Sequence, residues 1–209
     1  MSKEHPSARF WDKLAPKYSK KPVPDESIYQ RKLQLTQKYL KPDNVVLEFG
    51  CGTGSTALVH SKHVARLDAS DISTAMITIA RERAEQASVS NISFSIGQLE
   101  DFDYAAQTYD AVLGLNIMHL VEAPELTLNE VHRVLKPGGV FVSSTALLKH
   151  EPVFVRWILK VMQLFGRAPH INLMTKDEYL KQVTHAGFEI VEQWIPDKSS
   201  LFLIARKTV

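Results

Sequence analysis

The sequence predicts one α/β domain with a doubly wound, mostly parallel seven-stranded sheet, helices on both faces and an antiparallel C-terminal hairpin. Strand-like apolar runs alternate with helix-like segments between residues 45 and 145, an order that produces a parallel sheet covered by helices. Two further strand-like runs near the C-terminus are separated only by residues 196–200, too few for a crossover helix, so they should pair antiparallel. A chain of 209 residues fits one such domain.

The individual elements follow from apolar runs and from helix start and stop signals. The expected strands cover residues 45–49, 64–70, 92–96, 109–115, 140–145, 188–195 and 201–206. The expected helices cover residues 25–40, 55–62, 74–88 and 126–135. A last helix should begin at a capping box of Thr175 and Glu178 and end near Gly187. The Lys-Pro-Gly-Gly sequence at 136–139 predicts a turn before the fifth strand.

Composition excludes several classes of protein. Apolar residues make up 44% and charged residues 23%, as in ordinary globular chains. The net charge of +2 is too small to indicate a nucleic-acid partner. One cysteine allows no intrachain disulfide, which suits a reducing, cytoplasmic location. The N-terminus lacks a signal-peptide core, and no run of about 18 apolar residues predicts a transmembrane helix or a stable membrane anchor.

A glycine-rich loop is the strongest chemical signal. Residues 48–54 read Glu-Phe-Gly-Cys-Gly-Thr-Gly and lie between an expected strand and an expected helix. Glycines at alternate positions, Gly50, Gly52 and Gly54, allow a sharp turn and bring bare backbone against a ligand. The helix that follows offers unpaired N–H groups to an anionic group such as a carboxylate. The loop therefore predicts a cofactor site.

Three interpretations of this loop compete. A nucleotide triphosphate loop needs a lysine after the last glycine, and none follows Gly54. A dinucleotide fingerprint fails from Gly50, because Ser55 occupies the third glycine position. From Gly52 the third position is Ala57, which some dinucleotide sites tolerate, so the loop alone leaves NAD open. A loop without any ligand is the structural alternative.

Residues 45–145 resemble the class I S-adenosylmethionine-dependent methyltransferases, especially the small-molecule and quinone-type branch. The resemblance rests on the strand that ends at Glu48 before G-x-G-x-G, on Asp71-Ile72-Ser73 after the second strand, on the Lys-Pro-Gly-Gly turn and on the closing hairpin. It implies a Rossmann-like fold and an enzyme that transfers a methyl group from S-adenosylmethionine to a small-molecule or lipid-like acceptor by in-line displacement. A non-catalytic cofactor-binding or interaction protein, or an NAD-dependent oxidoreductase, remains the alternative.

The resemblance also implies cofactor-binding residues. Asp71 should accept hydrogen bonds from both ribose hydroxyls, which suits a carboxylate, with Asp68 as the competing candidate. Glu48 should hold the loop and lie close to the methionine amino group, unless its role is purely structural. The remaining contacts are expected from the loop and its surroundings, namely Gly50, Cys51, Gly52, Gly54 and Ile72. Cys51 fits as a small residue in a tight turn, since no base stands beside it.

One position departs from the family pattern. Family members often carry an acidic residue after the third strand for the adenine amino group, and here Gln98 stands there. A glutamine carbonyl can accept that bond without the charge. We therefore expect adenine contacts from Gln98 and Leu99, with Glu100 as a substitute. Asn116 follows the fourth strand, where ligands of open α/β sheets bind, and should face the cofactor near the sulfonium.

Two residues are candidates for the catalytic side of the site. His119 should face the methyl acceptor, although a histidine satisfied within its own loop explains the sequence equally well. Phe10, Trp11, Leu14 and Tyr18 have helical spacing and resemble an aromatic lid segment, in which Tyr18 closes over the cofactor. A docking aromatic is the alternative for Tyr18. The eight histidines form no metal-binding pattern, so no metal is expected.

The predicted single domain spans residues 1–209, with an N-terminal helical lid segment at 1–40 and a helical cap insertion at 146–174. Within the insertion, residues 152–165 are apolar except for Arg156, Lys160 and Gln163, which form one narrow stripe on a helix. Such a helix must bury most of its circumference. A cap over the acceptor with Trp157 in its wall, packing in the core or in a homodimer, and shallow membrane association all satisfy this condition.

Overall fold

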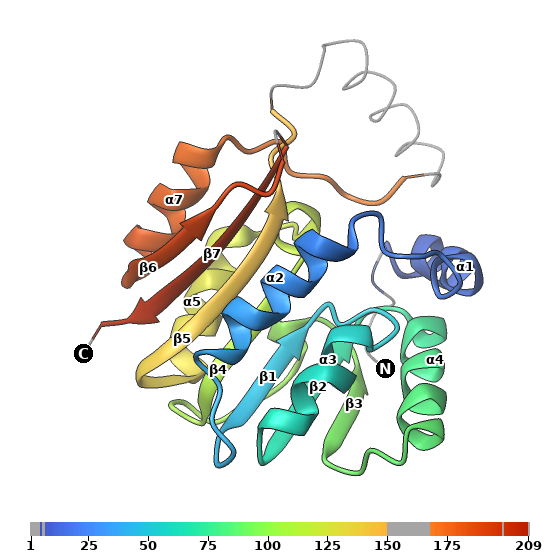
Figure 1. The fold of residues 1–209 in the computed structure, drawn as a ribbon. Helices are drawn as coiled ribbons and strands as arrows, with labels where there is room; N and C mark the ends of the chain where they lie inside the picture. Colours follow the sequence, from blue (N-terminus) through green and yellow to red (C-terminus); the bar gives the residue numbers. More distant parts are fainter. Residues whose placement is uncertain (1–4, 6, 150–167, 198, 209) are drawn as a thin grey trace.

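The computed structural model describes residues 5, 7–149, 168–197 and 199–208. Its seven strands form one sheet in the order β3-β2-β1-β4-β5-β7-β6 (Figure 1). The strands are β1 Val45–Phe49, β2 Arg66–Asp71, β3 Ile92–Ile96, β4 Tyr109–Leu115, β5 Leu135–Ala146, β6 Phe188–Trp194 and β7 Ser200–Lys207. The first five are parallel, and β7 pairs antiparallel with both β5 and β6. The predicted fold class is confirmed.

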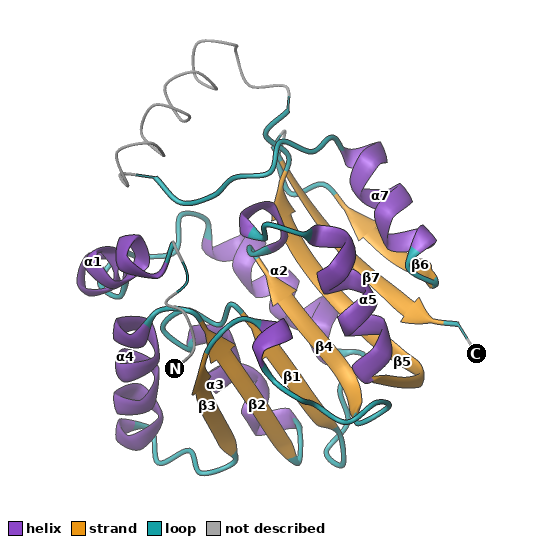
Figure 2. Cartoon of the chain, turned by 180° about the vertical axis from the view of Figure 1, so that it is seen from behind, coloured by secondary structure: helices purple, strands orange, loops and turns teal. Residues whose placement is uncertain are grey.

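Helices cover both faces of this sheet (Figures 1 and 2). The described α-helices are α1 Ala8–Tyr18, α2 Glu26–Gln37, α3 Ser55–His60, α4 Thr74–Gln86, α5 Pro124–Val134 and α7 Lys176–His185, and short 3-10 turns are η1 Ser61–His63, η2 Leu99–Asp101 and η3 Met118–Leu120. One apolar core joins Ala57 of α3 and Ile77 of α4 to the sheet. A second core joins Leu128 of α5 and Tyr179 of α7 to the opposite face.

The Lys-Pro-Gly-Gly sequence does not form the predicted turn. Strand β5 begins at Leu135 and runs through it, with an irregular register between Tyr109 and Ala111 of the neighbouring strand. Residues 136–139 have no partners in this register, and Lys136 Nζ lies 2.8 Å from Asp110 Oδ1 on β4 beside the irregularity. The segment is therefore a bulge within the sheet, where Gly138 adopts a φ of 76°.

Side-chain caps begin two of the helices, and the predicted capping box is confirmed. Thr175 Oγ1 accepts the Glu178 N–H at 3.2 Å, and Glu178 Oε2 accepts the Thr175 N–H at 2.9 Å, which completes the capping box. Ser73 Oγ accepts the Met76 N–H at 3.1 Å and begins α4. Both helices start where a side chain satisfies the free N–H groups of the first turn.

Helix α1 docks on the sheet edge through polar contacts as well as apolar ones. Asp12 Oδ1 accepts the Ser73 hydroxyl at 2.7 Å and the Ala75 N–H at 3.0 Å, at the start of α4. Arg83 of α4 donates to the Ser19 carbonyl oxygen, just past the end of α1, at 2.7 Å. The helix is thus held against α4 from its middle and from its C-terminal end, and the expected N-terminal helix is present.

The predicted helix at 152–165, including Trp157, lies outside the described residues. Within the described parts of the chain, no helix is long and apolar enough to cross a membrane.

His60 gives a test of the core. Its side chain is fully buried, and neither ring nitrogen has a hydrogen-bond partner among the described residues. Burial lowers the pKa of His60 to about 4, so stability is lost as the pH falls from about 6.5 toward 4. We expect His60→Leu to raise the free energy of unfolding by about 1–2 kcal/mol at pH 7, because an unsatisfied polar group disappears. The gain should grow by about 3 kcal/mol toward pH 4.

Urea unfolding of both proteins between pH 4 and 8 measures this difference. His185→Leu is the control, because His185 is exposed and, unlike His63, does not contribute to the pKa shift of His60. A His60→Leu variant less stable than the wild type at every pH would contradict the interpretation.

Candidate functional site

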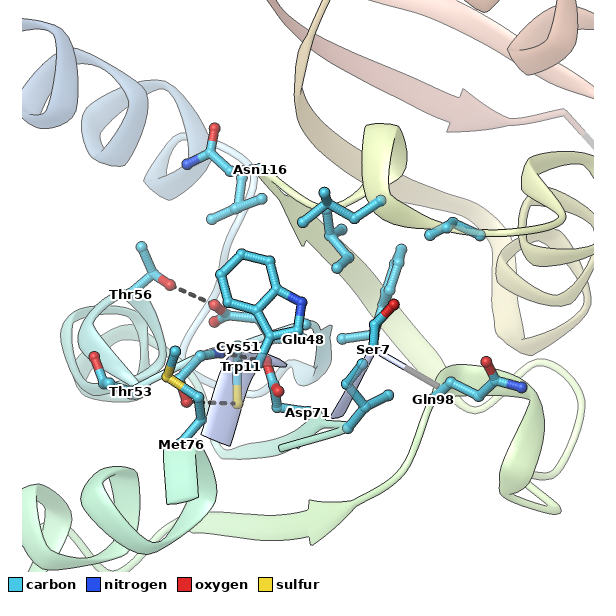
Figure 3. A pocket seen from close by; sticks show the side chains of 18 of the residues that line it. Ser7, Trp11, Glu48, Cys51, Thr53, Thr56, Asp71, Met76, Gln98 and Asn116 are labelled. Carbon is cyan, nitrogen blue, oxygen red and sulfur yellow. Dashed lines mark hydrogen bonds between the residues drawn. The ribbon is translucent and has the colours of Figure 1, made fainter. Parts of the chain in front are cut away.

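A cavity of about 740 Å³ lies at the carboxyl ends of the parallel strands, a size typical of small-molecule sites (Figure 3). Its wall comes from the loop after β1, the end of β2, the turn after β3 and η3 after β4. Trp11 and Tyr18 of α1 also line it. All the predicted cofactor residues except Gly54 line this cavity, and so do His119 and Tyr18.

The three glycines of the loop serve different purposes. Each has a positive φ, 64° at Gly50, 54° at Gly52 and 74° at Gly54. A Cβ at Gly50 would lie 2.6 Å from Ile117 Cγ1, and one at Gly54 would lie 2.9 Å from Ala80 Cβ. A Cβ at Gly52 would meet nothing within 4 Å, although Gly52 lines the cavity. Gly50 and Gly54 permit close packing, whereas Gly52 leaves room for a ligand.

The carboxylate of Asp71 joins the ends of β1 and β2. Its Oδ2 accepts the Gly52 N–H and its Oδ1 accepts the Ser73 N–H, both at 2.9 Å. Burial raises the pKa of Asp71, and these two bonds oppose the rise. Each carboxylate oxygen keeps a further lone pair for a ligand hydroxyl.

Asp68, the competing candidate, is placed differently. Its Oδ2 accepts the Tyr109 hydroxyl at 2.9 Å and lies 3.2 Å from the Arg66 guanidinium. Asp68 is not among the residues that line the cavity. Its partners are structural, so the geometry favours Asp71 as the residue available to a ligand.

Glu48 presents a buried carboxylate to the cavity. The side chain is 1% exposed, and its Oε1 accepts the Thr56 hydroxyl (Figure 3). Its Oε2 is buried without a hydrogen-bond partner in the described residues. Burial raises the pKa of Glu48 to about 7, against the opposing effect of Thr56. An unpartnered carboxylate oxygen is costly inside a protein, and a cationic ligand group would satisfy it.

Asn116 has a strained backbone at the end of β4. Its φ is 58°, in the left-handed region that costs energy for a residue other than glycine. Its N–H donates to the Ser144 carbonyl oxygen at 2.7 Å, and its Oδ1 accepts the Ser144 hydroxyl at 2.9 Å. Ser144 Oγ accepts in turn from Lys32 Nζ at 2.8 Å. These bonds leave the amide N–H groups of Asn116 as the donors available to the cavity.

The adenine-side candidates come together after β3. Ile72, Gln98 and Leu99 all line the cavity, and the Gln98 N–H donates to Asp101 Oδ2 at 2.9 Å. Glu100, the substitute candidate, also lines the cavity but accepts the Thr127 hydroxyl. The Gln98 side chain also accepts the Asp101 N–H in a capping box, so each of the two candidate acceptors already has one partner.

The two residues expected on the catalytic side have different surroundings. Tyr18 is partly exposed at the end of α1, and its pKa is raised by burial and by the nearby Asp71 carboxylate. His119 lies on η3, with Nδ1 3.3 Å from Thr145 Oγ1 and 3.3 Å from the Ala146 nitrogen, whose N–H it accepts. Burial lowers the pKa of His119 to about 4. Tyr18 thus lies by the expected ribose ligand and His119 by the end of β5.

The described residues provide neither a reactive thiol nor a metal site. The Cys51 thiol is buried, which raises its pKa well above the usual range and keeps it protonated. Among the described residues, no group of three His, Cys, Asp or Glu side chains could hold a metal ion.

Arg83 is a further residue of the site, and no motif in the sequence predicts it. Its guanidinium donates to Thr53 Oγ1 at 2.8 Å and to Ser55 Oγ at 3.0 Å, and the same group reaches the Ser19 carbonyl. Arg83 therefore links the glycine loop to the end of α1. Helical spacing is the one sequence feature that relates Arg83 to the site. Met76 and Arg83 are seven residues apart, so they lie on the same face of α4, and both line the cavity.

Comparisons with known proteins agree with this geometry. A family model described as a methyltransferase domain matches residues 46–139. The chain is similar to a demethylmenaquinone methyltransferase from Symbiobacterium thermophilum, with 31% identity over 113 residues. The chain thus matches the class I S-adenosylmethionine-dependent methyltransferases over residues 46–139. The alignment covers 52% of this chain and 45% of that relative, so the chain spans about half of the relative's length.

Two further matches extend over more of the chain. A ubiquinone biosynthesis O-methyltransferase from Cereibacter sphaeroides is 30% identical over 159 residues, which cover 71% of this chain and 61% of that protein. The solved structure of geranyl diphosphate C-methyltransferase from Streptomyces coelicolor superposes with a TM-score of 0.74 over 96% of both chains, at 14% identity. At that identity, the superposition shows that the two share a fold.

The open space over Gly52 can be tested by filling it. We expect Gly52→Val to abolish binding of S-adenosylhomocysteine, because the new side chain would occupy ligand space. Gly138→Val is the matched control, since Gly138 also has a positive φ and open space around its Cβ but does not line the cavity. Both variants should lose a similar 1–3 kcal/mol of stability from backbone strain.

Calorimetric titration and thermal unfolding distinguish the two effects. Equal loss of binding in both variants would attribute the effect to strain and remove Gly52 from the ligand site.

Proposed function

We propose that this chain catalyses methyl transfer from S-adenosylmethionine to a small-molecule or lipid-like acceptor. The observation that carries the proposal is the unpartnered, buried Oε2 of Glu48, in the same cavity as Asp71 and the open space over Gly52. When bound, the cofactor supplies a methyl group already activated by its sulfonium. The protein's part is to bind, orient and exclude water.

Each end of the cofactor has a matching group in the cavity. Glu48 pairs with the methionine ammonium, and Asp71 accepts the two ribose hydroxyls. Asn116 lies near the sulfonium, and Tyr18 and Trp11 close the cavity from α1. The loop and the adenine side are completed by Gly50, Cys51, Gly52, Gly54, Ile72, Gln98 and Leu99. The two carboxylates give the cavity negative charge, which suits a ligand with two cationic centres.

The acceptor side of the cavity is largely apolar. Beyond Asn116 the wall is formed by aliphatic side chains of the β4 end, η3 and the start of α5, namely Leu115, Ile117, Leu120, Val121 and Leu126. Such a wall favours an aromatic or prenylated acceptor over a polar metabolite. The names of the quinone-pathway relatives point to the same class of acceptor.

Turnover tests the function directly. The chain is incubated with methyl-labelled cofactor and a fractionated metabolite extract, and labelled products are identified by mass spectrometry. A labelled product that is absent with Gly52→Val supports the enzyme. Tight S-adenosylhomocysteine binding without a product in any fraction would favour the non-catalytic alternative.

Asp71 and Asp68 form a matched pair of the same residue type. We expect Asp71→Ala to weaken S-adenosylhomocysteine binding by about 2 kcal/mol, because charge-assisted hydrogen bonds to the ribose are lost. Asp68→Ala should leave the affinity unchanged while lowering stability, since the Tyr109 hydroxyl loses its partner. Calorimetry measures both, and unchanged affinity in Asp71→Ala would remove that residue from the site.

Glu48 predicts a pH dependence of binding. In the free protein its pKa is about 7, and pairing with an ammonium favours the ionised form, so binding displaces a proton below pH 7. The affinity for S-adenosylhomocysteine should therefore rise as the pH increases from 6 and level off above about 7. Calorimetry in two buffers of different ionisation enthalpy counts the released proton.

Glu48→Gln is the control for this linkage. The variant should bind weakly, with no such pH dependence. Because the folded-state pKa is raised, ionisation of Glu48 costs stability as the pH rises from about 4.5 through 7. The ligand-free variant should thus be roughly 2–3 kcal/mol more stable at pH 8. A variant that is less stable and binds normally would assign Glu48 a structural role.

A further inference from the structure

The ring of His119 is held in one tautomer. The backbone N–H of Ala146 donates to Nδ1 at 3.3 Å, and Thr145 Oγ1 lies at the same distance from this nitrogen. A backbone N–H can only donate, so Nδ1 carries the lone pair. In the neutral imidazole the hydrogen then resides on Nε2.

The other edge of the ring is available to a ligand. His119 lines the cavity, and no described residue forms a hydrogen bond with its Nε2. The backbone around it is fixed, because the His119 carbonyl accepts the Asn172 N–H at 2.7 Å and Met118 is fully buried. Burial alone lowers the pKa of His119, with no contribution from a charged side chain, so the ring is neutral at pH 7.

We propose that His119 is a fixed hydrogen-bond donor to the methyl acceptor and not a general base, and that the acceptors are acidic hydroxyl compounds, such as phenols, quinols or enols, that react as oxyanions. This inference rests on the proposed function. A base at Nε2 would need its lone pair there, and the ring hydrogen would then lie on Nδ1, against the Ala146 N–H. Two donors would face each other.

If the acceptor reacts as an oxyanion, the methyl transfer needs no base to remove a proton. The acceptor's electron pair forms the new bond to the methyl carbon, the pair of the broken carbon–sulfur bond stays on sulfur, and the negative and positive charges cancel. For attack by ring carbon, the ring hydrogen leaves to solvent afterwards. The hydroxyl proton has left to solvent on binding, since a fixed donor N–H favours the ionised form and outweighs the opposing effect of the apolar wall. Aliphatic alcohols, which ionise far less readily, are excluded.

The tautomer can be observed without any acceptor. In the protein labelled with nitrogen-15 histidine, two-bond nitrogen–proton spectra at pH 7 distinguish the two ring nitrogens, and His119→Gln identifies the His119 signals. We expect the proton on Nε2, both alone and with S-adenosylhomocysteine. A proton on Nδ1, or a doubly protonated ring at pH 7, would overturn the proposal. Cofactor binding is measured separately, so a failure of the proposed function is recognised independently.

A coloured phenol tests the donor role. With S-adenosylhomocysteine present, 4-nitrophenol is titrated with the protein across pH, and its absorbance reports the bound oxyanion. We expect a bound pKa at least one unit below the free value, a tenfold shift toward the anion. His119→Gln places an amide N–H close to Nε2 and should keep most of the shift, whereas His119→Leu should lose it. An equal shift in all three proteins, equal loss in both variants, or no binding of the phenol would overturn the proposal.

Discussion

The two hydrogen bonds to the Asp71 carboxylate are the constraint on which the site depends. They join the Gly52 N–H after β1 to the Ser73 N–H after β2. The loops that follow these two neighbouring parallel strands are therefore bound to the same carboxylate. Ser73 in turn caps α4 and binds Asp12 of α1. The glycine loop, the start of α4 and the docking of α1 therefore share one carboxylate, and its ligand-facing lone pairs are positioned by the fold itself.

Unfavourable local features concentrate at this same edge of the sheet. Among the described residues, Glu48 has a buried oxygen without a partner, Asn116 has a positive φ, and His119 is half-buried with a depressed pKa. None of these improves the stability of the ligand-free protein, and the apolar cores on the two faces of the sheet offset them. Such conflicts between local preference and global fold are expected where a protein prepares a binding site.

Sequence patterns were sufficient for the regular elements, because periodicity and caps are local. Strands β1, β3 and β4 lie at their predicted residues, and the capping box at Thr175 forms as expected. The run at 136–139 was predicted wrongly as a turn, since pairing of Lys136 with Asp110 on another strand keeps it in the sheet. The local sequence around residues 136–139 gives no information about a contact with another strand.

The candidate site likewise has a part that local sequence predicts and a part that depends on packing between distant segments. The glycine loop is a local signal, but the choice between Asp68 and Asp71 depends on strand phase: residues three apart on β2 point to opposite faces. The tautomer of His119 is set by Ala146 on β5, and the role of Arg83 is set by Ser19 on the N-terminal segment. These contacts depend on how β5 and α1 pack, which the local pattern does not specify.

The position of β7 affects the order in which the domain can assemble. β7 follows β6 in the chain, yet it lies between β5 and β6 in the sheet. During synthesis, the parallel strands and the whole glycine loop emerge first, while β5 keeps an unpaired edge until the last strand arrives. Its partners on β7 are distant in sequence, as Val140 pairs with Arg206, and such long-range pairing is slow to form. The nascent chain therefore passes through a stage with an open β5 edge, a surface prone to pairing with other chains.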